Sequence, residues 1–197
     1  MRIRTILAAA AAPAALGAVL LGTTAASAAT NPNPGTGAVI ITSQAQADGL
    51  SGTTINKNVD VPAGVTRPDG SPIWLTYAHI TGNVSIEGNV YMSGDTVDGN
   101  VTVSGPGSFL GLSNFASHFG RNLTVQNSSG TYQGGPGTMS FGNWTQYNAP
   151  SQVDGSFTFI NNSGGLYSGY PMLVTGGFTY SGNTSPVLDR SGLVLPE

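Results

Sequence analysis

The chain has 197 residues, with six Lys or Arg against nine Asp or Glu and a formal net charge of −3. So few basic residues cannot form the positive stripe that neutralises nucleic-acid phosphates, which argues against a nucleic-acid partner. The chain contains no Cys, so the fold depends on packing and backbone hydrogen bonds instead of disulfides or Cys-bound metals.

Residues 1–28 have the pattern of a secretory signal peptide. Two Arg residues within the first four positions supply positive charge, an apolar stretch runs from Ile6 to Leu21, and Ala26-Ser27-Ala28 is a typical cleavage pattern. We therefore expect a secreted, extracellular protein that begins near Ala29 and has no membrane span after cleavage. A retained transmembrane anchor is the alternative.

Two short segments follow the signal peptide. Residues 29–42 are rich in Pro and Gly and are predicted to form a flexible linker. Residues 43–54 are predicted to form a short N-terminal cap with one or two helical turns. In that cap Ser43 would be the N-cap, Gln46 would occupy the capping-box position and Gly49 would end the helix.

A short phrase, Gly-Asn-Val-Thr-Val and its relatives, recurs through the rest of the chain. It has the alternation of a β-strand, with both aliphatic side chains on one face and Thr on the other. Recurrence about every 21–22 residues indicates stacked repeats. The copies are Gly82-Asn83-Val84-Ser85-Ile86, Gly88-Asn89-Val90-Tyr91-Met92, Gly99-Asn100-Val101-Thr102-Val103, Arg121-Asn122-Leu123-Thr124-Val125, Gly142-Asn143-Trp144-Thr145, Gly155-Ser156-Phe157-Thr158-Phe159 and Gly177-Phe178-Thr179-Tyr180.

The spacing of these copies predicts the topology of residues 55–197. The stretch from Gly99 to Arg121 is one regular interval, and three short apolar segments separated by bends fit into it. Three strands per repeat describe one coil of a three-sided parallel β-helix, with about five or six coils and a C-terminal capping tail. A β-sandwich is the alternative, but it requires longer strands and hairpin turns.

The register is irregular at two places. The interval from Arg121 to Gly155 is half as long again as the regular one, so either the Trp144 phrase ends a short coil or a loop is inserted near residues 148–150. The register between Asn122 and Gly155 therefore stays open. Gly82 and Gly88, in contrast, are much closer together than one interval, so we expect them on two sides of one coil.

The repeated phrase resembles a group of secreted bacterial proteins with Gly-Asn-Val-Thr-Val repeats that are read as right-handed parallel β-helices. The resemblance covers about residues 55 to 182 and implies an all-β, single-stranded, right-handed solenoid. It implies little about activity, because the wider β-helix class includes polysaccharide lyases and hydrolases, adhesins and phage tailspikes.

The phrase also predicts which side chains face the interior and which face solvent. Val84, Val101, Leu123, Phe157 and Phe178 are expected to point inward. The Thr column would then point outward, either as an ordinary solvated strand face or as a rank that matches ice or a crystal surface. The Asn column, at Asn83, Asn100, Asn122 and Asn143, is expected at a bend where Asn tolerates a left-handed backbone and its amides bond from coil to coil.

Two carboxylates are the candidates for catalysis. Asp98 and Asp154 occupy the same place in two Asp-Gly phrases, where they could cleave a glycosidic bond or hold Ca²⁺ for a lyase. Asp before Gly is also common in turns, and the separation of these two positions fits no whole number of regular coils. The two histidines, His79 and His118, complete no recognisable catalytic or metal motif, so no cofactor or metal is predicted.

Aromatic side chains are the candidates for ligand binding, because any that point outward could stack on sugar rings. Trp144 and Tyr147 are the first choice, and packing inside the solenoid is the alternative. The resulting hypothesis is a non-enzymatic secreted β-solenoid, a structural or adhesive module at the cell envelope or in the extracellular matrix, with a glycan or cell-surface polymer as partner. The alternatives are a carbohydrate-binding or polysaccharide-degrading protein, and a binder of ice or crystal surfaces.

Overall fold

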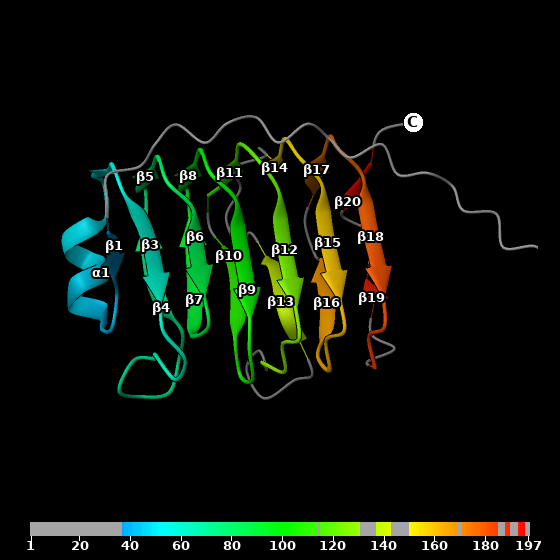
Figure 1. Ribbon diagram of the computed structural model, residues 1–197, viewed down its shortest axis with the longest axis horizontal. Coiled ribbons are helices and arrows are strands. Elements are labelled where there is room, and N and C mark those ends of the chain that lie inside the picture. The colour runs from blue at the N-terminus through cyan, green and yellow to red at the C-terminus, as the bar shows by residue number, and fades with distance from the viewer. Residues whose placement is uncertain are drawn as a thin grey trace, which may run out of the picture. The chain divides into compact units, whose positions relative to one another are not determined.

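The computed structural model describes residues 37–113, 115–130, 137–142, 150–168, 171–184, 188–189 and 193–195. These residues form 20 short β-strands and one α-helix of seven residues. All described strand pairs are parallel, and successive coils stack side by side (Figure 1). The predicted all-β parallel solenoid is therefore confirmed, with about six turns.

Six coils contribute one strand each to all three parallel sheets, whereas the first coil, which holds the helix, contributes to only two of them. Sheet A contains β1 (Ala38–Ile40), β3 (Asn58–Val61), β6 (Val84–Ile86), β9 (Val101–Ser104), β12 (Leu123–Gln126), β15 (Phe157–Ile160) and β18 (Phe178–Ser181). Sheet B contains β2 (Thr54–Ile55), β5 (His79–Ile80), β8 (Thr96–Val97), β11 (His118–Phe119), β14 (Ser151–Val153), β17 (Met172–Val174) and β20 (Leu193–Val194). Sheet C contains β4 (Ile73–Thr76), β7 (Asn89–Ser93), β10 (Phe109–Ser113), β13 (Gly137–Gly142), β16 (Gly165–Ser168) and β19 (Leu188–Asp189).

Five of the seven copies of the phrase lead into sheet A strands, β6, β9, β12, β15 and β18. Direct pairing joins the predicted inward residues into one column, in the order Val84, Val101, Leu123, Phe157 and Phe178. The first four are buried and Phe178 is half-buried against the core. Their alternation with half-buried or exposed Ser and Thr assigns the two faces of sheet A as expected.

The irregular interval is one long coil. Leu123 pairs directly with Phe157 at its two ends, so no short coil intervenes. The extra residues enter on both sides of β13, because Leu110 pairs with Met139 while His118 pairs with Gln152. Gly142 pairs with Ser113 in sheet C, so the Trp144 phrase does not repeat the sheet A phrase. Gly82 and Gly88 precede β6 and β7, on two sides of one coil as predicted.

The N-terminal boundary of the solenoid differs from the predicted one. Residues 38–40, assigned above to the linker, form β1 and pair with β3, and Ile41 is fully buried. The apolar run from Ala38 to Ile41 gains enough buried surface to join the sheet, which its Pro- and Gly-rich flank obscured in the sequence. Residues 1–36, including the predicted signal peptide, lie outside the described residues.

Helix α1 (Gln44–Leu50) covers the first coil (Figure 1). Ser43 is the N-cap as predicted, since its side chain accepts a hydrogen bond from the Gln46 N–H. The capping box is not closed, however, because Gln46 Oε1 accepts from the Thr42 N–H at 2.7 Å. The helix also continues through Gly49 to Leu50, with Ser51 as its C-cap, so the predicted end was one residue early.

Gln44 protects the first edge of sheet C. Its side-chain amide donates to the Trp74 carbonyl at 2.9 Å and accepts from the Trp74 N–H at 2.8 Å. One side chain thus supplies both hydrogen bonds that a further strand would give to this residue of β4. Unpaired edge strands invite association with other chains, so this contact acts against it.

Asn residues serve two corners in different ways. Where the chain enters sheet A, the side-chain oxygens of Asn58, Asn83, Asn100 and Asn122 accept hydrogen bonds from backbone N–H groups of the following coil, at 2.9 to 3.3 Å. The left-handed Asn residues lie at the other end of the strand, at Asn127 (φ 51°) and Asn161 (φ 54°). The predicted coil-to-coil bonding is therefore present, but the predicted left-handed backbone was assigned to the wrong corner.

Candidate functional site

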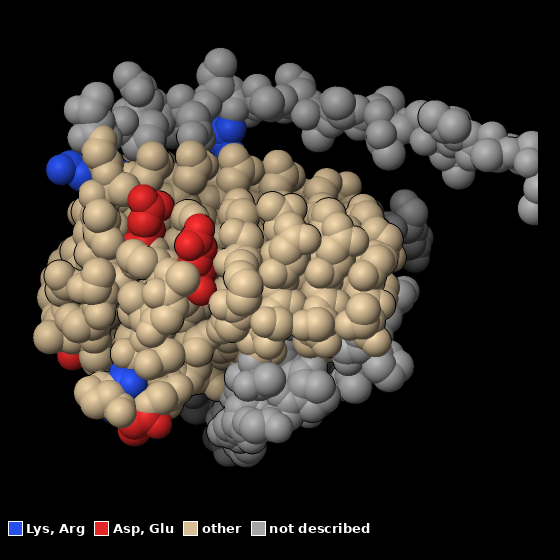
Figure 2. Space-filling model, turned by 60° about the horizontal axis from the view of Figure 1, so that its bottom comes forward, with Lys and Arg blue, Asp and Glu red and all other residues tan. Residues whose placement is uncertain are grey.

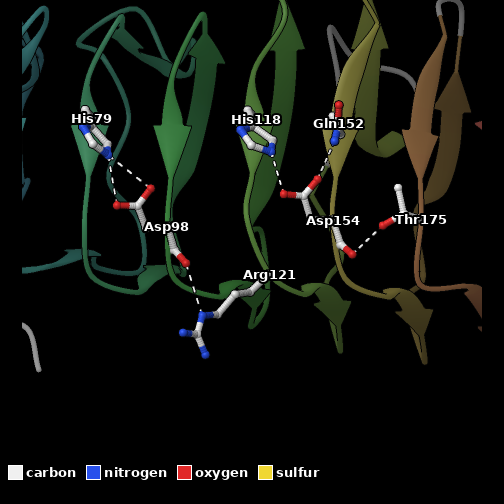
Figure 3. Close-up of polar contacts among 7 residues, drawn as sticks. All are labelled: His79, Asp98, His118, Arg121, Gln152, Asp154 and Thr175. Carbon is white, nitrogen blue, oxygen red and sulfur yellow. Dashed lines mark hydrogen bonds and ion pairs between the residues drawn. The ribbon is translucent and has the colours of Figure 1, made fainter. Parts of the chain in front are cut away.

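The outer face of sheet B brings together both histidines and both candidate carboxylates (Figure 3). His79, Thr96, His118 and Gln152 occupy one column of directly paired residues on successive coils. Asp98 follows β8 and Asp154 follows β14, each two residues beyond that column. We call these side chains the His–Asp row: His79, Asp98, His118 and Asp154.

The row consists of two pairs that are alike in residue type and position. His79 Nε2 lies 3.1 Å from Asp98 Oδ1 and 3.0 Å from Oδ2, and His118 Nε2 lies 2.9 Å from Asp154 Oδ2. In each pair the histidine belongs to one coil and the aspartate to the next. The side chains are 39 to 45% exposed, so solvent screens the attraction strongly.

Neighbouring side chains donate hydrogen bonds to the backbone carbonyls of both aspartates and to the carboxylate of Asp154. Arg121 Nε donates to the Asp98 carbonyl at 3.3 Å, while Gln152 Nε2 donates to the Asp154 carboxylate. The Thr175 hydroxyl donates to the Asp154 carbonyl from the next coil. Figure 3 shows these contacts following one another from coil to coil. Each aspartate therefore links its own coil to another one.

The two carboxylates are not neighbours. One coil, carrying Gly120 at the equivalent position, separates Asp98 from Asp154, so their backbones are about 10 Å apart at the usual strand spacing. The two carboxyl groups of a retaining glycosidase are about 5–5.5 Å apart, and those of an inverting enzyme are about 6.5–9.5 Å apart. Here both groups lie in one row on one face.

The His–Asp pairs were missed in the sequence although a signal exists. Each histidine stands three positions before the repeated phrase, and each aspartate stands one position before it. Alignment of the coils on the phrase itself, instead of on total length, would have placed each aspartate diagonally across from a histidine. The insertions in the long coil hide the relation between His118 and Asp154 when positions are compared by a fixed coil length.

Asp95 lies beneath this row, on the inside of the corner between β7 and β8. It is 1% exposed and accepts hydrogen bonds from the Ala78 and Ser93 N–H groups, both at 2.7 Å, while its own N–H donates to Ser117 Oγ at 3.3 Å. Burial raises the pKa of Asp95 to about 7, against the opposite effect of its two backbone donors. Asp95 is thus a structural carboxyl that joins three coils, separate from the exposed Asp98.

Outward aromatic side chains gather on sheet C and at its corner. Trp74 stacks on Tyr91 with ring centroids 4.6 Å apart, and Tyr91 meets the edge of Phe109 at 5.5 Å. Tyr77, at the following corner, is 53% exposed. Trp144 and Tyr147, the sequence-based candidates, lie outside the described residues, so that prediction stays untested.

The Thr column is a single direct rank on sheet A. Ser85, Thr102, Thr124, Thr158 and Thr179 pair one to the next, whereas Thr145 lies outside the described residues. The adjacent outward column is mixed, with Ser104, Gln126, Ile160 and Ser181. Figure 2 shows described acidic side chains toward the α1 end and none over the later coils in that view.

Within the described ranges, no three His, Asp or Glu side chains are grouped closely enough to hold a metal ion. The described part of the chain also has no helix that is long and apolar enough to cross a membrane. No protein-family model, curated protein or solved structure matches this sequence.

Proposed function

We propose that this protein is a non-enzymatic, secreted β-solenoid that acts as a structural or adhesive module at the cell envelope or in the extracellular matrix. The observation that supports this most is the His–Asp row. The two candidate catalytic carboxylates each contact their own histidine across a coil boundary, which gives both groups a structural role.

The geometry of the row favours this proposal over the polysaccharide-degrading alternative. A hydrolase needs an acid and a base or nucleophile on either side of the scissile bond. Asp98 and Asp154 lie about two strand spacings apart, farther than in a retaining pair, and each carboxylate already contacts a histidine, while Asp95 is buried on the inner side. Contacts of this kind are better suited to connecting coils than to cleaving a glycosidic bond.

The Thr column gives the crystal-surface alternative less support. A crystal lattice repeats in two dimensions, so a matching surface needs at least two regular ranks of similar groups. Sheet A has one rank of hydroxyls, and its neighbouring column changes from Ser to Gln to Ile. An irregular surface of this kind is better suited to general adhesion than to lattice matching.

Co-sedimentation of the purified protein with isolated bacterial envelopes and with insoluble matrix polysaccharides tests the proposal. We expect the protein in the pellet, with no soluble sugar released during overnight incubation. Protein that stays in every supernatant would contradict the adhesive role. Released product that disappears in Asp98→Asn or Asp154→Asn would assign the protein to the enzymes.

A further inference from the structure

We propose that Tyr77 is the platform of a binding site for a neutral polysaccharide, at the corner between sheets C and B. The inference rests on the proposed adhesive function and gives it a ligand class and a place on the molecule.

The corner that holds Tyr77 has a left-handed backbone on three successive coils. Gly52, Tyr77 and Gly94 have φ values of 72°, 54° and 73°. Each donates its N–H to a carbonyl of the following coil, to Thr76, Ser93 and Phe115 respectively, at 2.9 to 3.1 Å. The three residues are therefore structural equivalents, and only the middle one carries a side chain.

A tyrosine at this position costs free energy that glycine does not. The left-handed region brings Cβ close to the following carbonyl oxygen, and bulky residues adopt it rarely. Gly52 and Gly94 on the neighbouring coils show that glycine is sufficient to form this corner. Strained residues of this kind are concentrated at functional sites. The backbone strain at Tyr77 must be offset by contacts of the ring or be retained for a function.

Packing of the Tyr77 ring compensates for only part of the free energy that the left-handed backbone costs. The ring lies over Gly94, where a Cβ would come within 2.7 Å of it, and its centroid is 5.0 Å from that of Phe115. Gly94 thus keeps space for the ring. Yet Tyr77 remains 53% exposed, so about half of a large aromatic side chain faces solvent at the expense of a strained backbone.

The chemistry around Tyr77 suits a neutral sugar. The C–H face of a pyranose ring packs on an aromatic ring, and its hydroxyl groups need polar partners nearby. His79 is two residues further along the chain, and its half-exposed pair with Asp98 supplies polar groups on the strands that follow this corner. A net charge of −3 disfavours a polyanionic polymer.

The test compares variants that keep the left-handed corner. Tyr77→Gly matches Gly52 and Gly94, and Tyr77→Asn is a second variant that tolerates the same φ; both should melt at or above the temperature of the unaltered protein. Tyr77→Phe keeps the ring. Asn161→Gly, at a left-handed position on another corner, is the matched control. Binding is measured by sedimentation with microcrystalline cellulose, chitin and insoluble starch.

We expect at least one polymer to retain the protein, with affinity lowered about tenfold or more in Tyr77→Gly and Tyr77→Asn and nearly unchanged in Tyr77→Phe and Asn161→Gly. Equal retention of Tyr77→Gly would overturn the site and leave the adhesive function standing. Retention by none of the three polymers would also overturn the site, while the envelope assay still decides the adhesive function. A large fall in melting temperature in Tyr77→Gly would show that the ring is structural, and Tyr77-dependent doubling of mass would assign the surface to a second copy.

Discussion

At the scale of single residues, Asp95 makes stability depend on pH. Its pKa of about 7 is above the ordinary value of 3.8, so between these values the folded chain holds a proton that the unfolded chain has lost. The free energy of unfolding therefore falls as pH rises, by up to about 1.4 kcal/mol per pH unit. The contribution is fully present below about pH 4 and is lost as pH rises through about 7.

Urea unfolding of Asp95→Asn and the unaltered protein at several pH values between 4 and 8 tests this. We expect the unaltered protein to lose stability relative to the variant as pH rises, by a total on the order of 4 kcal/mol. The variant itself is weakened at all pH values, because its NH₂ group faces a backbone N–H. Asp60→Asn, on the outer face of sheet A, is the control. Parallel pH profiles for Asp95→Asn and the unaltered protein would show that Asp95 does not titrate in this range.

Val101 and Thr102 test the assignment of the two faces of sheet A. Val101 is fully buried between Val84 and Leu123, so Val101→Asp leaves a carboxylate without a partner in the core and should cost several kcal/mol. Thr102 is half-buried on the outer face, and Thr102→Asp should cost about 1 kcal/mol or less. Thermal unfolding measures both. Similar losses in the two variants would mean that the faces are assigned wrongly.

At the scale of elements, α1 acts as the cap of the first coil through Gln44. Gln44→Ala leaves the Trp74 N–H and carbonyl without their partner and should lower the free energy of unfolding by about 1–3 kcal/mol. It should also raise self-association, because the β4 edge becomes available to other chains. Gln46→Ala, in the same helix but bonded only to Thr42 by its side chain, is the control. Urea unfolding and light scattering measure the two effects. A Gln44→Ala variant that stayed monomeric and fully stable would show that the helix caps the coil by apolar contact alone.

Some strands could be predicted from the sequence alone and others could not. The sheet A strands from β6 to β18 could be predicted because a copy of the phrase marks each of them, whereas β1 carries no copy and was assigned to the linker. Apart from the Gly88 copy in β7, the strands of sheets B and C carry no regular copy of the phrase, and β5, β8 and β11 are only two residues long, too short for any periodicity. The long coil between Leu123 and Phe157 could not be divided correctly, because the sequence Gly142-Asn143 imitates the phrase although Gly142 ends a sheet C strand.

The candidate site was harder to predict than the fold. Asp98 and Asp154 were found through their shared Asp-Gly context, but their histidine partners are 19 and 36 residues away in the sequence. Those separations have meaning only after the coils are aligned. Asn was also ambiguous, since it both tolerates a left-handed backbone and bonds through its side-chain oxygen, and the structure uses these properties at different corners.

At the scale of the whole molecule, polar side chains connect successive coils, as the buried apolar side chains of the core do. The Asn side chains entering sheet A, the His–Asp row outside sheet B and the buried Asp95 all connect one coil to the next. With no disulfides, a stack of short parallel strands depends on such nearest-neighbour contacts. We therefore propose that the His–Asp row holds coils together and takes no part in polysaccharide cleavage.

The most direct test of that claim is a double-mutant cycle of His118→Gln and Asp154→Asn, with polysaccharide turnover measured on the same four proteins. We expect a coupling free energy of about 0.3–1 kcal/mol, the size expected for an exposed pair, and no released product from any of the four. Zero coupling, together with product release by the unaltered protein that either substitution abolishes, would contradict it.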